Sequence, residues 1–187
     1  MKLIIGLGNI GEEYDKTRHN IGFEFIDYFA GKIGVKINKK SGHGLMSSKA
    51  IAGEEIILLK PTTYMNESGK AANFFKNKYG IPTENILVIH DDVDLLPGKI
   101  KIKKGGGDAG HKGIASIIKA LNSGDFIRLR IGIGKAQSKR EMVDYVLGKF
   151  TPDETAEFEK KFPAVEKFIF DFITMGYEKA AGRFKDE

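Results

Sequence analysis

The first candidate for chemistry is a histidine in a polar stretch of the chain. His19 follows Thr17 and Arg18 and precedes Asn20, just ahead of a segment with helical apolar spacing. Histidine titrates near neutral pH, so it is the side chain best suited to act as a general base. A lone histidine is more often structural or incidental, so His19 needs a partner before it can be given a role.

Candidate partners lie in the run His90-Asp91-Asp92. This run follows residues 85–89, an aliphatic segment with the composition of a buried strand. In α/β proteins, functional groups usually gather beyond the carboxyl ends of the strands. A carboxylate bonded to one imidazole nitrogen would fix the tautomer and leave the other nitrogen to take a proton from water.

The nucleophile is expected to be water. The chain has no cysteine and no G-x-S-x-G motif, so a covalent thiol or serine mechanism has no support. It also lacks the H-E-x-x-H pattern of zinc hydrolases, and His90, Asp91, Asp92 and Asp94 suggest at most an adventitious cation site. We therefore do not expect a required metal ion.

A first glycine motif tests the alternative of a nucleotide-dependent oxidoreductase. Gly6, Gly8 and Gly11 have the G-x-G-x-x-G spacing directly after an apolar segment. The dinucleotide fingerprint also needs a helix at the third glycine and an acid at the end of a second strand. Here residues 12–20 are polar, and the candidate acid Asp27 lies inside a helical pattern. A dinucleotide site is therefore disfavoured.

A second glycine motif spans residues 105–113 and resembles a phosphate-binding loop. It places His111 where that loop has lysine, and it lacks the following serine or threonine, so a nucleoside triphosphatase is disfavoured. A glycine-rich turn that leads into a helix still exposes backbone N–H groups, which attract phosphate. The glycines would equally suit a tight turn that needs positive φ.

Lysines alternate with isoleucines directly before this turn. A strand over residues 99–104 would place Lys99, Lys101 and Lys103 on one face and bury the isoleucines. Exposed lysine faces are usually only solvated, but this one adjoins a candidate anion-binding turn. Arg128 and Arg130 add charge on another strand, so the segments together predict a phosphate track.

The elements that must position these residues alternate between strands and helices. We expect an α/β protein with strands at residues 2–8, 55–60, 85–89 and 126–133 and helices at 21–33, 68–79 and 113–121. Thr151, Pro152 and Glu154 have the types of a capping box with proline at the first helical position. A helix pair divided at Pro163 is expected to follow.

Length and composition limit the class of protein. The 187 residues fit one domain, and the absence of cysteine agrees with a reducing cytoplasm. The N-terminal apolar run is too short for a signal sequence or a membrane span, so an intracellular protein with no membrane partner is expected. The net charge of +5 permits an anionic partner but is a weak signal by itself.

Taken in order, these segments resemble the bacterial peptidyl-tRNA hydrolases. The resemblance covers roughly residues 3–149 and rests on six motifs. They run from Gly6 through Gly22, from Pro61 through Gly69, from His90 through Leu95, from Gly105 through Gly113, from Arg128 through Gly134, and from Val146 through Lys149. It implies a single catalytic domain over residues 1–187, with a twisted mixed sheet flanked by helices. It also implies a cytoplasmic monomer that hydrolyses the ester of peptidyl-tRNA and recycles tRNA in translation, without a cofactor.

Site roles follow from the matching positions. His19 matches the family's general base, Asp91 the carboxylate that holds it, and Asn9 the residue that separates peptidyl-tRNA from free aminoacyl-tRNA. Asn66 is an amide donor that could stabilise the oxyanion formed on the ester carbonyl. Positions expected to contact substrate or tRNA are Tyr14, Tyr64, Asn66, His111 and Lys112, with Lys103 and Arg130 from the basic strands.

Two positions depart from the family's pattern. Ile10 stands where proline is usual, which should only loosen a turn. Lys112 stands where asparagine is usual, so a neutral hydrogen bond to the substrate is replaced by a charge suited to phosphate. Residues 138–147 are expected to cover the substrate. A non-catalytic RNA-binding protein on the same fold stays as the alternative, against which the retention of His19 and Asp91 argues.

Overall fold

One mixed β-sheet organises the chain. The computed structural model describes residues 1–135, 138 and 140–186. Its seven strands lie in the order β2-β3-β4-β1-β5-β7-β6. Their bounds are β1 Lys2–Gly6, β2 Lys39–Ser41, β3 Gly44–Ile51, β4 Glu54–Pro61, β5 Ile86–Asp92, β6 Ile100–Lys104 and β7 Ile127–Gly132. The central strands β4, β1, β5 and β7 run parallel, whereas β2, β3 and β6 pair antiparallel with their neighbours. The predicted α/β class is confirmed.

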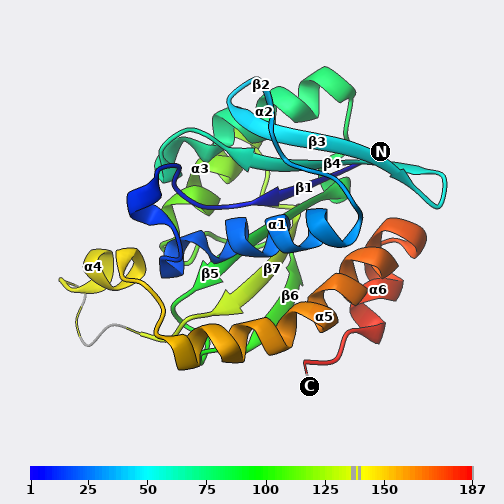
Figure 1. Ribbon diagram of the computed structural model, residues 1–187. Helices are drawn as coiled ribbons and strands as arrows, with labels where there is room; N and C mark the ends of the chain where they lie inside the picture. Colours follow the sequence, from blue (N-terminus) through cyan, green and yellow to red (C-terminus); the bar gives the residue numbers. More distant parts are fainter. Residues whose placement is uncertain (136–137, 139, 187) are drawn as a thin grey trace.

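Helices cover both faces of the sheet (Figure 1). One face carries α1 Ile21–Lys32, α5 Pro152–Met175 and α6 Tyr177–Arg183, and the other carries α2 Ser68–Tyr79 and α3 Lys112–Leu121. The short helix α4, Met142–Leu147, lies beyond the edge where the parallel strands end. The described residues also form four 3-10 turns: η1 Glu12–Tyr14, η2 Arg18–Asn20, η3 Met65–Glu67 and η4 Thr83–Asn85.

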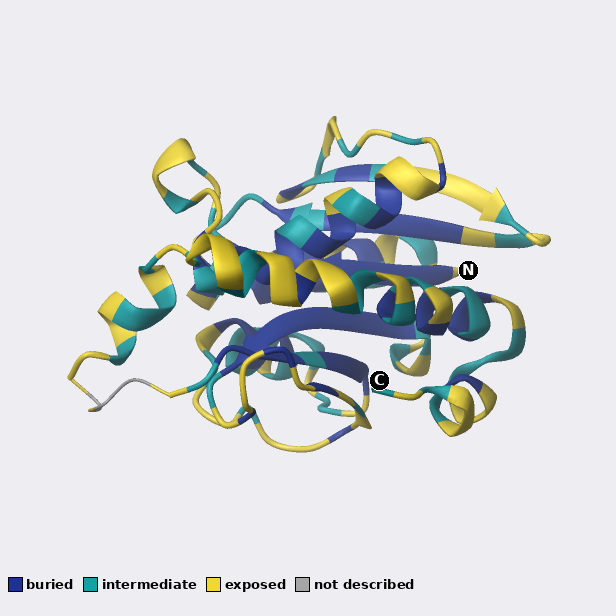
Figure 2. Ribbon diagram, turned by 60° about the horizontal axis from the view of Figure 1, so that its bottom comes forward, coloured by how far each residue is buried: buried dark blue, intermediate teal, exposed yellow. Residues whose placement is uncertain are grey.

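The central strands are buried on both faces, as Figure 2 shows for the middle of the sheet. Successive side chains point to opposite sides of a strand. Accordingly, Ile4 packs with Phe25 and Phe168 in the layer under α1 and α5. Its neighbour Ile5 packs with Phe75 and other side chains under α2 and α3. The sheet is therefore rigid where it supports the loops at its edge.

Close backbone contact brings the start of α1 against β5 and the end of β1. A Cβ on Gly22 would lie 2.4 Å from the carbonyl oxygen of Ile89 and 2.6 Å from the amide nitrogen of Leu7. Only glycine fits such an approach without movement. The start of α1, and with it His19, can therefore lie directly against the strand that carries Asp91.

Most predicted elements are confirmed, but one element was not predicted and one helix boundary was predicted wrongly. The hairpin of β2 and β3 was not expected. Pro163 was expected to end a helix, but it lies inside the continuous helix α5, and the break comes at Gly176. An interior proline costs about 3 kcal/mol or more. The buried face of α5, which includes Phe158, Phe168 and Phe172, outweighs that cost.

Among the helices that the structure describes, none is both long enough and apolar enough to cross a membrane.

Candidate active site

A cleft of about 650 Å³ opens at the carboxyl ends of β1 and β5. Its polar floor is formed by Asn9, His19 and Asp91, which come from three separate segments. The remaining walls come from η3, from the turn before α3, and from α4. The sheet edge named by the sequence analysis thus collects the predicted catalytic residues in one place.

His19 and Asp91 form a hydrogen-bonded pair, although 72 residues separate them. Nδ1 of His19 lies 2.8 Å from Oδ1 of Asp91, and the carboxylate side chain is only 2% exposed. An ionised carboxylate can only accept, so Nδ1 carries the proton. Nε2 of His19 then has its lone pair free, and no hydrogen bond within the described residues engages it. The arrangement fits a general base that faces the cleft.

A second histidine shares the same carboxylate oxygen. Nε2 of His111 lies 2.9 Å from Oδ1 of Asp91. The other ring nitrogen, Nδ1, accepts from the backbone N–H groups of Gly113 and Ile114 at 3.1 and 3.3 Å, so it caps α3. Because Nδ1 accepts, Nε2 must carry the proton and donate to Asp91. The helix start therefore fixes the tautomer of His111.

Two buried groups at the cleft floor have displaced pKa values. Burial alone would raise the pKa of Asp91, but the charges and hydrogen bonds of His19 and His111 hold it well below the usual range. Burial, followed by the neighbouring His111, lowers the pKa of His90 to about 3. Nδ1 of His90 donates to the backbone oxygen of Asp91 at 2.6 Å. His90 is thus neutral at working pH and supports the main chain of Asp91.

The amide of Asn9 is held in one orientation. Its Oδ1 accepts from the backbone N–H of Met65 at 3.2 Å. Asn20 holds the backbone of Asn9 through two hydrogen bonds, of 2.8 and 2.9 Å. Within the described part of the chain, no hydrogen bond engages Nδ2 of Asn9, although Asn9 lines the cleft. This amide is a fixed donor next to His19.

The other predicted substrate contacts divide into two groups. Asn66 and Tyr64 line the cleft, and the Tyr64 side chain is almost fully solvent-accessible, with 77% of the residue exposed. Tyr14 lies in η1 and is not one of the lining residues. The structure therefore brings Tyr64 and Asn66 into the same cleft as His19 but leaves Tyr14 outside it.

One wall of the cleft is apolar and comes from α4. Met142, Val143, Val146 and Leu147 contribute to it. The predicted cover, residues 138–147, includes these side chains, while Lys139 lies outside the described residues. None of the residues of α4 is fully buried, so the helix has little core of its own to hold it.

The glycine turn before α3 is built differently from the prediction. Arg128 is buried and donates to the carbonyl oxygens of Gly106, Gly107 and Gly124, so it supports the turn and does not add surface charge. The N–H groups of Gly113 and Ile114, expected to attract phosphate, are already used by His111. The prediction of a tight turn with positive φ is confirmed, because φ is 104° at Gly106.

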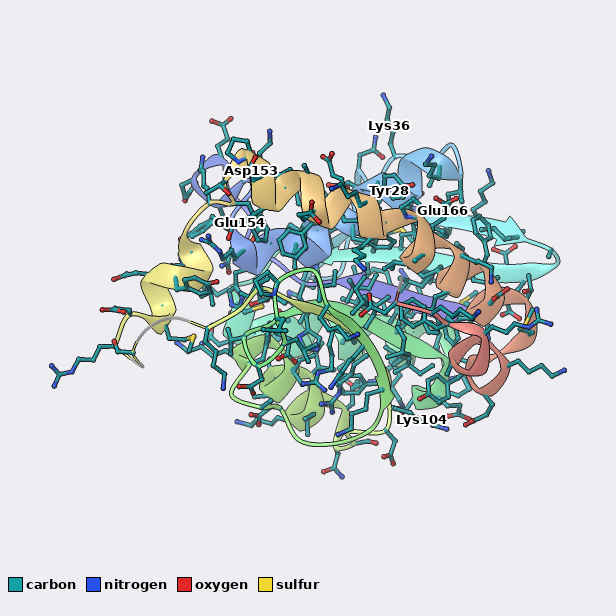
Figure 3. The ribbon with its side chains drawn as sticks, turned by 90° about the horizontal axis from the view of Figure 1, so that it is seen from below. Tyr28, Lys36, Lys104, Asp153, Glu154 and Glu166 are labelled. Carbon is teal, nitrogen blue, oxygen red and sulfur yellow. The ribbon has the colours of Figure 1, made fainter. Side chains whose placement is uncertain are left out.

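The basic strand is confirmed, but its lysines are not equivalent. Ile100 is buried, and Lys101, Lys103 and Lys104 are exposed on the edge strand β6 (Lys104 is labelled in Figure 3). Lys99 lies just before the strand, and its Nζ is 3.0 Å from Oδ2 of Asp186. Lys103 lies beside Gly106 of the glycine turn. A phosphate track would therefore run over Lys101 and Lys103.

Arg130 and Lys112 differ in their relation to the cleft, because Lys112 is one of the lining residues and Arg130 is not. Nε of Arg130 donates to Oδ2 of Asp92 at 2.6 Å, so part of its charge is paired. Lys112 is the first residue of α3, is exposed, and lines the cleft. The position of Lys112 agrees with a role facing the substrate.

The only cluster of metal-ligand type among the described residues is His19, Asp91 and His111, whose ligand atoms all lie within 4.8 Å of one another. In this structure each histidine hydrogen-bonds to the carboxylate of Asp91. The pair of His19 and Asp91 was predicted from the sequence, whereas the bond between His111 and Asp91 was not. A signal for this bond was the place of His111 at the start of a predicted helix. A side chain there often accepts from backbone N–H groups, and a histidine that accepts through one ring nitrogen donates through the other.

Known proteins resemble this chain over its full length. The family model for peptidyl-tRNA hydrolase matches residues 3–187. A peptidyl-tRNA hydrolase of Clostridium tetani is 44% identical over 186 residues, covering 100% of this chain and 98% of the relative. One of Thermoanaerobacter sp. is 46% identical over 184 residues, with coverage of 98% and 99%. The crystal structure of peptidyl-tRNA hydrolase from Acinetobacter baumannii has a TM-score of 0.92 and 36% identity, covering 100% of this chain and 97% of that one.

Proposed function

The chain belongs to the peptidyl-tRNA hydrolase family, and we propose that it cleaves its substrate with His19 as the general base. It is a carboxylic ester hydrolase that separates the peptide from tRNA and so returns tRNA to translation. The observation that carries the mechanism is the 2.8 Å bond between His19 and the buried Asp91 at the floor of the cleft. It leaves Nε2 of His19 ready to accept a proton.

The proposed reaction uses water and the chain's own side chains. Nε2 of His19 takes a proton from water while the water oxygen attacks the ester carbonyl carbon. The resulting tetrahedral oxyanion collapses by breaking the bond to the ribose oxygen. That oxygen leaves with the proton returned by His19, and the peptide leaves as a carboxylic acid. Asp91 stabilises the transiently protonated imidazole.

Amide donors suit the charge that forms on the carbonyl oxygen. Asn66 lines the cleft and is exposed, so its Nδ2 can turn toward the oxyanion. Asn9 is fixed, and its Nδ2 can donate to a carbonyl oxygen of the peptide. A free aminoacyl-tRNA offers a charged amine there instead. Asn9 therefore favours peptidyl-tRNA over aminoacyl-tRNA.

The polynucleotide is proposed to run from the cleft across the glycine turn to the edge strand. Lys112, Lys103 and Arg130 supply positive charge along this route, and the turn that carries His111 lies between them. Tyr64 offers an exposed ring in the cleft lining, and Tyr14 is a contact outside the cleft. Residues 1–187 would act as one catalytic domain, as a monomer in the cytoplasm, where translation takes place.

Release of tRNA tests this function. Purified protein should liberate free tRNA from N-blocked aminoacyl-tRNA, with unblocked aminoacyl-tRNA as the control substrate. Activity on only the blocked substrate is expected. Binding of tRNA without hydrolysis of either substrate would favour the RNA-binding alternative and reject the proposal.

A further inference from the structure

Arg18 precedes the catalytic histidine in the chain but contacts the elements behind the cleft. Its terminal nitrogen Nη2 donates to both carboxylate oxygens of Glu154, at 2.9 and 3.0 Å. Nη1 lies 3.5 Å from the carbonyl oxygen of Tyr145. One side chain therefore joins η2 to the first turn of α5 and to the last turn of α4, and it is only 12% exposed.

Aromatic and backbone contacts strengthen the same junction. The guanidinium carbon of Arg18 lies 4.6 Å from the ring centre of Tyr145 and 5.5 Å from that of Phe150. The backbone N–H of Arg18 donates to Gly148 at 3.0 Å. A Cβ on Gly148 would lie 3.0 Å from Nη1 of Arg18, so glycine leaves room for the guanidinium. The segment after α4 is shaped around this side chain.

Arg18 contacts α4 and the residue that follows it. None of the residues of α4 is fully buried, yet the helix forms the apolar wall of the cleft. Its anchors include Tyr145, which also donates through its hydroxyl to the carbonyl oxygen of Ile133, and the following Gly148. Arg18 contacts both Tyr145 and Gly148, and the next residue in the chain is His19.

We propose that Arg18 is a positioning residue for ester hydrolysis, which holds the His19 loop, the α4 wall and the start of α5 in one fixed arrangement. The proposal rests on the proposed role of His19 as the base. General base catalysis depends on placement, because a misplacement of about 1 Å can cost on the order of 10²-fold in rate. A guanidinium suits the task because its planar fork can donate to two partners while it stacks on a ring.

The test compares two carboxylates on the same helix. Glu154 holds α5 to Arg18, and Glu166 holds α5 to α1 by accepting from the hydroxyl of Tyr28 at 2.9 Å; both carboxylates are labelled in Figure 3. Glu154→Gln removes the charge that Arg18 contacts, and Glu166→Gln is the matched control. Arg18→Lys keeps the charge but loses the fork. We would measure kcat and KM on N-blocked aminoacyl-tRNA, thermal unfolding, and the 15N–1H NMR signal of the His19 ring.

The expected result is a decrease in kcat of about 10-fold or more for Arg18→Lys and Glu154→Gln, with a changed Nδ1–H signal of His19. Glu166→Gln should stay within about twofold of the parent and leave that signal unchanged. If Arg18→Lys does not fold, Glu154→Gln carries the test.

Two results would overturn the proposal. In the first, folded Arg18→Lys and Glu154→Gln lose no more kcat, relative to the parent, than Glu166→Gln does. The other is a rise in KM alone with an unchanged His19 signal, since Arg18 would then shape only the α4 wall. Normal turnover by His19→Ala is a separate outcome, which rejects the proposed base and therefore also the role of Arg18.

Discussion

The rings of His19 and His111 lie 5.0 Å apart, centre to centre, because both donate to the same oxygen of Asp91. The two histidines are not equivalent. Nδ1 of His111 is bound to the start of α3, whereas Nε2 of His19 faces the cleft. Asp91 therefore accepts from one histidine that is tied to the start of α3 and from another that lines the cleft.

His19→Ala should abolish most ester hydrolysis while the affinity for tRNA changes by no more than a few-fold. A positioned general base typically contributes about 10²–10⁴-fold to the rate, and the side chain has no expected contact with phosphate. Single-turnover rates and tRNA binding, measured separately, check this. Turnover close to that of the parent would remove His19 from the mechanism.

His111→Asn separates the two functions of that side chain. Asparagine is a good N-cap, so the stability of α3 should be kept, whereas His111→Ala should cost about 1 kcal/mol of stability. Both variants lose the donor to Asp91, and kcat should fall in both. Urea unfolding and kcat are the measurements. Full activity in the folded asparagine variant would show that the bond from His111 to Asp91 does not matter for catalysis.

The sequence predicted the pair of His19 and Asp91 better than it predicted their surroundings. Strands such as residues 85–89 have continuous aliphatic runs, and those patterns reflect burial directly. In contrast, β3 has a half-exposed, polar face, so its pairing with β4 left little trace in the pattern. Arg128 was predicted to be a surface charge, but the glycine turn buries it. That burial depends on residues about 20 positions away and is not visible in the local sequence. Proline usually ends a helix, but the packing of α5 keeps Pro163 inside a continuous helix.

Folding stability should fall in acid because of His90. The pKa of His90 is about 3 in the folded protein, below its ordinary value, so the unfolded chain binds a proton there that the folded chain does not. Above about pH 6.5, His90 does not change the free energy of unfolding with pH. Below that pH, the free energy of unfolding decreases by ~1.4 kcal/mol per pH unit until the pKa of His90 in the folded protein is reached.

The comparison with His90→Gln isolates this contribution. Between pH 7.5 and 5.0 the parent's free energy of unfolding should decrease by about 2 kcal/mol more than that of the variant. Urea titrations at the two pH values measure the difference. Parallel pH dependence in the two proteins would show that His90 takes up its proton in the folded state.

The lysines at the edge strand should differ in their effect on tRNA binding. Lys103 lies by the glycine turn, whereas Lys99 is paired with Asp186. Lys103→Ala should reduce the log–log slope of affinity against salt by about 0.7–0.9, which corresponds to one lost phosphate contact. Lys99→Ala is the matched control and should leave the slope unchanged. Equal slopes in all three proteins would mean that tRNA takes another route.

The last prediction concerns Lys112, the position that departs from the family's usual asparagine. Lys112 is exposed at the start of α3 and lines the cleft, where the helix dipole already favours an anion. Its ammonium should therefore contact a phosphate oxygen of the substrate, an interaction that weakens as salt rises. Lys112→Asn should keep kcat and flatten the salt dependence of KM. Lys119→Asn, the same change in the last turn of α3, is the control. A slope for Lys112→Asn equal to that of the control would place the ammonium of Lys112 in solvent and leave phosphate binding to the turn.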